Sequence, residues 1–203
     1  MPHLAEGGRA MSETASAMDR LLASLGPGRG RGAPPLERWD PPFCGDLDMR
    51  IAADGTWFYL GTPIGRPALV KLFASVLWRE GDRYFLKTPV EKVGISVEDA
   101  PFQAVEMAVT GEGEGRAIAL RTGVDDLVSV GPEHGLRFDV EAGGGLKPYV
   151  HVRRGLWARL TRALSHDLLA LGEIRPVEGR AMFGVAAAGS FYPAIPASEI
   201  EGL

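Results

Sequence analysis

The sequence predicts an α+β protein made of two tandem repeats, each with a β-hairpin, a helix and further antiparallel strands. Two local patterns predict this class: an Asp54-Gly55 turn between short apolar strands, and a following helix with one apolar face. The third observation is that a similar series of elements recurs roughly 87 residues later, as expected for a duplicated unit.

Length sets the domain organisation. The 203 residues suffice for two small domains or one duplicated fold. We divide the chain into a flexible leader, residues 1–35, a first α+β unit, residues 36–101, and a second α+β unit, residues 102–203. The leader is expected to hold one short helix starting near Ser12, followed by a linker rich in Gly, Arg and Pro.

The first unit is expected to begin with an extended segment. The stretch Trp39–Asp46 is too rich in proline for a helix or a central strand. The hairpin follows, because both residues of Asp54-Gly55 accept the positive φ of a tight turn. A helix is expected to begin near Arg66, because Pro67 suits the first helical position. Its predicted apolar face consists of Leu69, Leu72, Phe73, Val76 and Leu77, and further strands are expected at 84–86 and 93–97.

The second unit repeats this pattern. Its expected strands lie at 102–109, 117–121, 136–138, 149–152 and 180–188. The strand at 136–138 matches Met49–Ile51, and a glycine turn at 143–145 replaces Asp54-Gly55. A second helix is expected to begin at Arg154, with an apolar face made of Trp157, Leu160, Leu164 and Leu168.

Composition excludes several classes of protein. Hydrophobic residues make up 45% and charged residues 24% of the chain, which is typical of a globular protein. The net charge of −4 disfavours nucleic acid as a partner, because nucleic-acid binders usually carry a basic excess. The N-terminus has no export signal, and no apolar run is long enough to cross a membrane. Cys44 is the only cysteine, so no intramolecular disulfide can form, and we expect a cytoplasmic protein.

One candidate for catalysis is Cys44, which needs a base beside it to act as a nucleophile. The candidate bases are His134, His151 and His166, but none forms part of a known Cys/His signature. A lone cysteine in such a position is more often structural, and we expect Cys44 to be buried.

A second candidate is the pair Asp46 and Asp48, which places two carboxylates on one side of an extended chain, as in metal-assisted phosphoryl enzymes. In such enzymes the pair follows an apolar strand, whereas here it precedes one. The four histidines lack the spacing of metal ligands, so neither a metal nor another cofactor is expected.

Basic residues recur at matching positions of the two repeats. Arg66 and Arg154 stand at the expected helix starts, where the helix dipole disfavours an isolated cation. A helix N-terminus with unpaired N–H groups and an arginine suits a phosphate or a carboxylate. We therefore predict a small anionic ligand or an acidic protein partner. The predicted binding residues are Arg50, Arg66, Lys71, Arg137, Arg154 and Arg159.

The alternative for these basic residues is structural. The arginines would then pair with acidic strand residues such as Glu98, Asp99 or Asp139 and leave no site for a ligand.

Several segments of the first unit together resemble a known family. They are Pro41–Asp46, Met49–Ile51, Asp54–Trp57, Pro63-Ile64, Leu69–Phe73, Tyr84–Leu86, Thr88–Lys92 and Val97–Phe102. On these segments the chain resembles bacterial proteins grouped as the domain-of-unknown-function family number 1285, over most of residues 36–200. The resemblance implies a duplicated α+β fold, no assigned activity and at most a signalling or regulatory role. It implies no catalytic residues.

These patterns together predict a non-catalytic binding or regulatory protein. The alternative is a hydrolase-like enzyme that uses Cys44 or the Asp46/Asp48 pair. If the chain is a binding protein, a ligand should stabilise it in a saturable way without turnover. If it is an enzyme, its activity should depend on a metal or on a reactive thiol.

Overall fold

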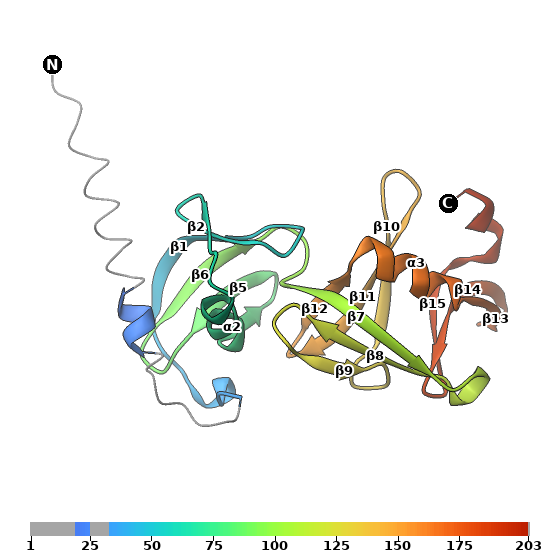
Figure 1. The fold of residues 1–203 in the computed structure, drawn as a ribbon, viewed down its shortest axis with the longest axis horizontal. Coiled ribbons are helices and arrows are strands. Elements are labelled where there is room, and N and C mark those ends of the chain that lie inside the picture. The colour runs from blue at the N-terminus through green and yellow to red at the C-terminus, as the bar shows by residue number, and fades with distance from the viewer. Residues whose placement is uncertain (1–18, 25–32, 203) are drawn as a thin grey trace, which may run out of the picture. The chain divides into compact units, whose positions relative to one another are not determined.

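The computed structural model describes residues 19–24 and 33–202 (Figure 1). Most of the predicted leader, including Ser12, lies outside the described residues, but residues 19–24 are helical and bury Leu21. The chain divides into two units, residues 1–98 and 99–203, and each is described by itself. The described chain is mostly β with few helices, so the sequence analysis overestimated the share of helix.

The first unit contains a six-stranded sheet with the order β3-β2-β1-β6-β5-β4. Its strands are β1 (Phe43–Ile51), β2 (Trp57–Tyr59), β3 (Thr62–Pro63), β4 (Leu77–Glu80), β5 (Arg83–Lys87) and β6 (Lys92–Val97). Neighbouring strands are antiparallel except for the central pair, β1 and β6, which is parallel. The α-helix α2 (Pro67–Ser75) connects β3 to β4, and the short 3-10 helix η1 (Leu36–Arg38) precedes β1.

The second unit contains a six-stranded sheet with the order β10-β11-β12-β7-β8-β9. Its strands are β7 (Phe102–Thr110), β8 (Ala117–Thr122), β9 (Leu127–Ser129), β10 (Leu136–Val140), β11 (Leu146–Arg153) and β12 (Leu156–Leu160). Again one central pair, β7 and β12, is parallel, and the other neighbours are antiparallel. The 3-10 helix η2 (Gly113–Gly115) lies between β7 and β8.

Beyond β12 the second unit has elements without a counterpart in the first sheet. The α-helix α3 (Arg162–Ala170) leads to a three-stranded antiparallel sheet, and the 3-10 helix η3 (Ala197–Gly202) follows it. The strands of this sheet are β13 (Glu173–Val177), β14 (Arg180–Ala187) and β15 (Ser190–Pro196).

The two six-stranded sheets share one topology. In each, the first three strands form one meander, the last three form another, and the first strand pairs in parallel with the last. By this topology β1 corresponds to β7, and β4 corresponds to β10. The predicted match of the strand at 49–51 with that at 136–138 was therefore wrong by half a repeat, because it paired β1 with β10.

The predicted start of the first helix was correct, but α2 ends at Ser75, so Leu77 of the predicted apolar face begins β4 instead. Arg66 is the N-cap residue of α2, and Pro67 occupies its first turn. Trp57 of β2 and Phe73 of α2 stack with ring centroids 6.2 Å apart, and both are buried. Burying a large apolar side chain contributes about 1.5–3 kcal/mol, so this contact holds α2 against the sheet.

The prediction that a helix begins at Arg154 was wrong. Arg154 lies in the tight turn between β11 and β12 with a φ of 49°, and α3 begins at Arg162. In β12 the buried Leu156, Ala158 and Leu160 alternate with half-buried residues, which is the period of a strand. Thr161 caps α3, because its hydroxyl accepts a hydrogen bond from the Leu164 N–H at 3.4 Å.

The extended segment Trp39–Asp46 also differs from the prediction. Its second half belongs to β1, a central strand, because Pro41 and Pro42 stop just before the strand and interrupt no ladder. The Pro42 carbonyl accepts the Lys92 N–H at 3.0 Å, and this bond extends the pairing of β1 with β6.

None of the described helices has the length and apolar character needed to cross a membrane.

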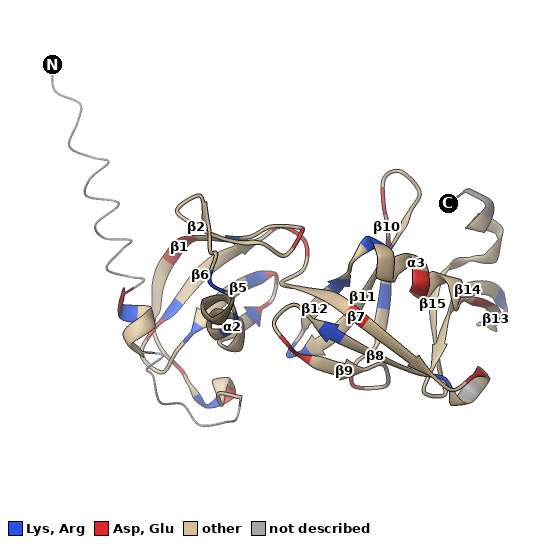
Figure 2. Cartoon of the chain, viewed as in Figure 1, with Lys and Arg blue, Asp and Glu red and all other residues tan. Residues whose placement is uncertain are grey.

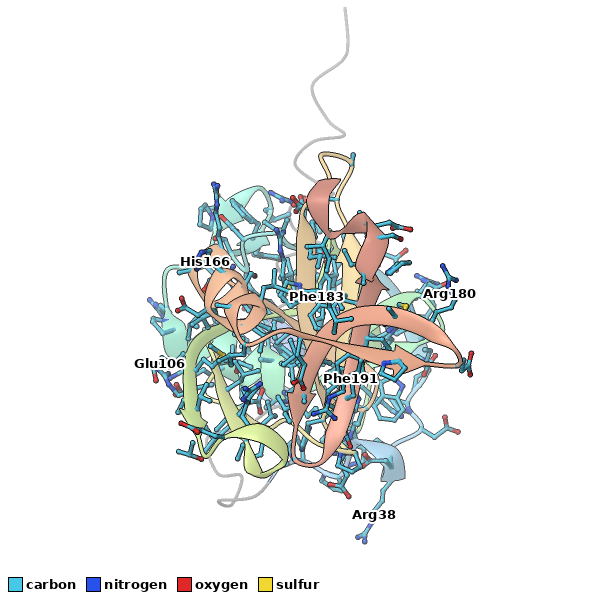
Figure 3. All side chains as sticks on the ribbon, turned by 90° about the vertical axis from the view of Figure 1, so that its right-hand side faces the viewer. Arg38, Glu106, His166, Arg180, Phe183 and Phe191 are labelled. Atoms are coloured by element: carbon cyan, nitrogen blue, oxygen red, sulfur yellow. The ribbon has the colours of Figure 1, made fainter. Side chains whose placement is uncertain are left out.

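Sheet β13-β14-β15 depends on a close approach between two strands. Figure 3 shows Phe183 and Phe191 on this sheet. A Cβ atom placed on Gly184 of β14 would lie 2.2 Å from the Tyr192 carbonyl oxygen and 2.8 Å from Cζ of Phe191. Because the nearest obstacle is backbone, only glycine fits at this position without moving β15.

We therefore expect Gly184→Ala to destabilise the second unit by roughly 1–3 kcal/mol, the usual cost of overpacking a well-packed site. Urea unfolding followed by circular dichroism measures this difference. Gly143→Ala is the matched control, because a Cβ atom there meets nothing within 4 Å. Equal stability of the two variants would contradict the close approach of β14 and β15.

Candidate functional site

Three of the six predicted binding residues, all of them arginines, form ion pairs with the acidic residues that the structural alternative named. Arg50 of β1 pairs with Glu98, and its guanidinium lies 4.3 Å from the centroid of the Phe58 ring. Arg137 of β10 donates hydrogen bonds to both oxygens of Asp139 at 3.0 Å. The third pair, between Arg159 of β12 and Asp99, has a distance of 3.1 Å. Figure 2 shows Lys and Arg on the strands of both sheets, with Asp and Glu interspersed.

The two ion pairs of the second unit belong to one larger polar cluster around Asp99. Arg137, Tyr149 and Arg159 are neighbours across β10, β11 and β12. The Tyr149 hydroxyl donates a hydrogen bond to Asp99 at 2.6 Å, and Arg159 also contacts Glu141 at 3.3 Å. Burial raises the pKa of Tyr149, and its bond to the Asp99 carboxylate raises it further. Each cation of this cluster therefore already has a carboxylate partner.

The other predicted cations lie elsewhere. Arg66 and Lys71 are exposed at the start and in the middle of α2, whereas Arg154 lies in a hairpin turn. The cation at the second helix start is Arg162, which the sequence analysis missed. The hydroxyl of Thr161 as an N-cap could have identified it.

The structure places Cys44 differently from the prediction, since this residue is exposed. The register of β1 shifts between Phe43 and Asp46, where Gly45 has a φ of 97°, so the segment turns outward. Asp46 is engaged by Arg83 at 2.6 Å and does not form a free pair with Asp48. Within the described part of the chain, no three His, Cys, Asp or Glu side chains gather as metal ligands.

A lysine of the first unit that was not among the predicted residues is largely buried. Lys87, at the end of β5, is only 7% exposed. Its ammonium lies 4.3 Å from the centroid of the Trp78 ring. Among the described residues, none forms a hydrogen bond or an ion pair with this ammonium. The ammonium is not among the fully buried nitrogen and oxygen atoms, so the stem of Lys87 is buried while its charged end still reaches solvent and can accept a ligand.

A second lysine stands directly beside it. Lys92 of β6 is the cross-strand partner of Lys87, and Phe43 of β1 is the partner of Lys92 on its other side. Like charges directly opposite each other on neighbouring strands destabilise a sheet. We call this cluster the lysine site and define it by Trp78, Glu80, Phe85, Lys87 and Lys92.

Glu80 shows how the lysine site holds a carboxylate. Its two oxygens accept hydrogen bonds from the Lys92 ammonium at 2.9 and 2.8 Å. The Trp78 indole N–H donates to the same carboxylate at 3.0 Å. The bonds from Lys92 lower the pKa of Glu80, and Trp78 and the charge of Lys87 lower it further. One carboxylate is thus bound by Lys92, while Lys87 keeps its hydrogen-bond donors for another group.

The charges of the lysine site do not balance. Two lysines stand against one glutamate, so the site carries a net charge of about +1 at neutral pH. The sequence analysis did not identify the lysine site, because the segment Lys-Thr-Pro-Val-Glu-Lys at residues 87–92 has the composition of an ordinary solvent-exposed turn. The signal that could have found it is that a tight turn places both lysines side by side on paired strands.

Comparisons with known proteins place both units in one family. A family model described as "Domain of unknown function (DUF1285), N-terminal domain" matches residues 34–100. Its counterpart, "Protein of unknown function (DUF1285), C-terminal domain", matches residues 101–194. Among curated proteins, none matches the sequence.

Two solved structures are similar to the chain. A DUF1285 family protein from Silicibacter pomeroyi DSS-3 is 48% identical, with a TM-score of 0.81, over 89% of this chain and 97% of that one. A DUF1285 family protein from Shewanella baltica OS155 is 32% identical, with a TM-score of 0.48, over 61% of this chain and 91% of that one. With both family models matched across its two units, the chain belongs to the DUF1285 family.

Proposed function

We propose that this chain is a non-catalytic binding protein with a regulatory role, and that it recognises a carboxylate of a small ligand or an acidic partner at the lysine site. The observation that carries the proposal is that the side chain of Lys87 is 7% exposed and that its ammonium, which still reaches solvent, has no hydrogen-bond or ion-pair partner among the described residues. Proteins tend to break local energetic rules at functional sites, where a ligand supplies the missing interaction.

The physical case compares the lysine site with the other cation clusters. Arg50, Arg137 and Arg159 each have a carboxylate partner within the fold, so an incoming anion would have to displace it. Lys87 requires no such exchange. A bound carboxylate would satisfy its donors through charge-assisted hydrogen bonds and would reduce its repulsion with Lys92.

The enzyme alternative draws less support from the geometry. A hydrolase based on Asp46 and Asp48 would need both carboxylates available, and Arg83 holds Asp46. Cys44 is exposed, and its Sγ donates to the Pro42 carbonyl at 3.5 Å, which does not activate a thiol.

We expect Lys87→Met to stabilise the protein or to leave its stability unchanged, with a gain of up to roughly 2 kcal/mol. The physical reason is that an apolar side chain of similar length keeps the buried stem contacts and removes a partly desolvated cation without an ion-pair partner among the described residues. Urea unfolding of both proteins measures the difference. A loss of more than about 2 kcal/mol would show that the contact of Lys87 with Trp78 is needed for folding, as some desolvated cation–π contacts are.

The same two proteins test binding. Acetate, compared with chloride at equal ionic strength, should raise the unfolding midpoint of the wild-type protein and not that of Lys87→Met. Lys71→Met, which removes an exposed lysine from α2, is the matched control and should keep the response to acetate. An equal response of all three proteins would refute binding at the lysine site.

A further inference from the structure

We infer that the ligand of the lysine site is a monocarboxylate carried on a flat apolar body, such as an aromatic acid or a partner segment that presents an acidic and an aromatic group together. This inference rests on the proposed function and adds the chemical class of the ligand. It follows from two properties of the site: its charge and the aromatic side chains beside the lysines.

The charge of the site fits one negative charge. Lys87 and Lys92 stand against Glu80, and the neighbouring pair of Arg83 and Asp46 is neutral. A monocarboxylate would bring the site to neutrality. A phosphate dianion would leave the site negative and would lie close to the Glu80 carboxylate, whose low pKa keeps it ionised.

The arrangement of donors also fits a carboxylate. Cβ atoms of directly opposed residues on antiparallel strands lie about 4.5–5.5 Å apart, so flexible lysines at these positions can converge on one group. Two of the three donors of Lys92 serve the oxygens of Glu80, whereas no described residue accepts from Lys87. The ligand carboxylate therefore binds Lys87 first and takes the remaining donor of Lys92.

Aromatic rings supply the second half of the site. Trp78 and Phe85 are cross-strand neighbours on β4 and β5, under the two ammonium groups. The Phe43 ring meets Phe85 edge to face, with centroids 6.1 Å apart, and 49% of Phe43 is exposed. The Arg83 guanidinium lies 5.3 Å from the centroid of the Phe43 ring, and the exposed part of this ring stays open to a ligand.

The apolar body of the ligand would cover Phe43. Offset or edge-to-face contact between aromatic rings adds to the energy of area burial, so a carboxylate with a ring should bind more tightly than one without. Phosphate and acetate lack such a body and can use only the lysines.

The test is calorimetric titration of benzoate, acetate and inorganic phosphate at pH 8 and equal ionic strength. The proteins are wild type, Lys87→Met and Phe43→Ala. We expect benzoate to bind the wild type at least roughly tenfold more tightly than acetate, the gain typical of burying part of a ring. Phe43→Ala should lower the affinity for benzoate and leave that for acetate unchanged, and Lys87→Met should abolish both. If Phe43→Ala proves unfolded by circular dichroism, Phe43→Leu takes its place, because it removes the ring and keeps the apolar volume.

The outcomes separate the two proposals. Equal affinities for benzoate and acetate, both lost in Lys87→Met, would overturn the inference about the apolar body and leave the proposed function intact. Affinities unchanged by Lys87→Met would overturn both proposals. Tighter binding of phosphate than of benzoate would overturn the assignment of a monocarboxylate.

Discussion

The parallel pairing of the first and last strands is the constraint on which each six-stranded sheet depends. A parallel pair cannot be joined by a tight turn and needs a long connection, here the four strands between β1 and β6 or between β7 and β12. This pairing brings β6 beside β1 and so places Lys92 between Phe43 and Lys87. Without it, the lysine site would lose the exposed aromatic side chain beside its lysines.

The same pairing acts in the second unit with a different result. There, β12 lies beside β7, and Arg159 stands in a row with Arg137, Tyr149 and Gln103. The corresponding strands of the first unit carry the row Trp78, Phe85, Gly94 and Asp46. In the second unit, Arg137 and Arg159 are paired with nearby carboxylates, whereas Lys87 of the first lacks a carboxylate partner among the described residues. The same topology thus carries a cluster of paired charges in the second unit and a cluster with an excess positive charge in the first.

Local chemistry explains which elements could be predicted from the sequence. The predicted turn lies at Asp54-Gly55, but only Gly55 has a positive φ, 84°, and the Asp54 carboxylate instead accepts the Thr56 N–H at 2.9 Å. Pro67 opens α2 because its ring suits the first helical turn. The helix expected at Arg154 does not exist, although the apolar residues after it are spaced three or four apart as in a helix. These residues are divided between a strand and the helix that follows it. In fact Leu160 ends β12, while Leu164 belongs to α3.

The candidate site was beyond such reasoning for a different physical reason. The burial of Lys87 depends on the order of the strands in the sheet. The residues next to Lys87 in the sequence, such as Thr88, do not reveal that order. The ion pairs of Arg50, Arg137 and Arg159 were foreseen only as an alternative, because the charge pattern alone does not say which acids lie within reach. The sequence analysis matched the wrong strands of the two repeats. Corresponding strands such as β1 and β7 share a position in the sheet but have few residues in common.

The central claim is that Lys87 is the cation that receives a carboxylate. The most direct measurement is the nuclear magnetic resonance spectrum of the lysine ammonium groups during a titration with benzoate. We expect saturable shifts of the Lys87 and Lys92 ammonium signals, with those of Lys71 and Lys147 unchanged. Shifts of equal size at all of these lysines, or at Lys71 alone, would contradict it.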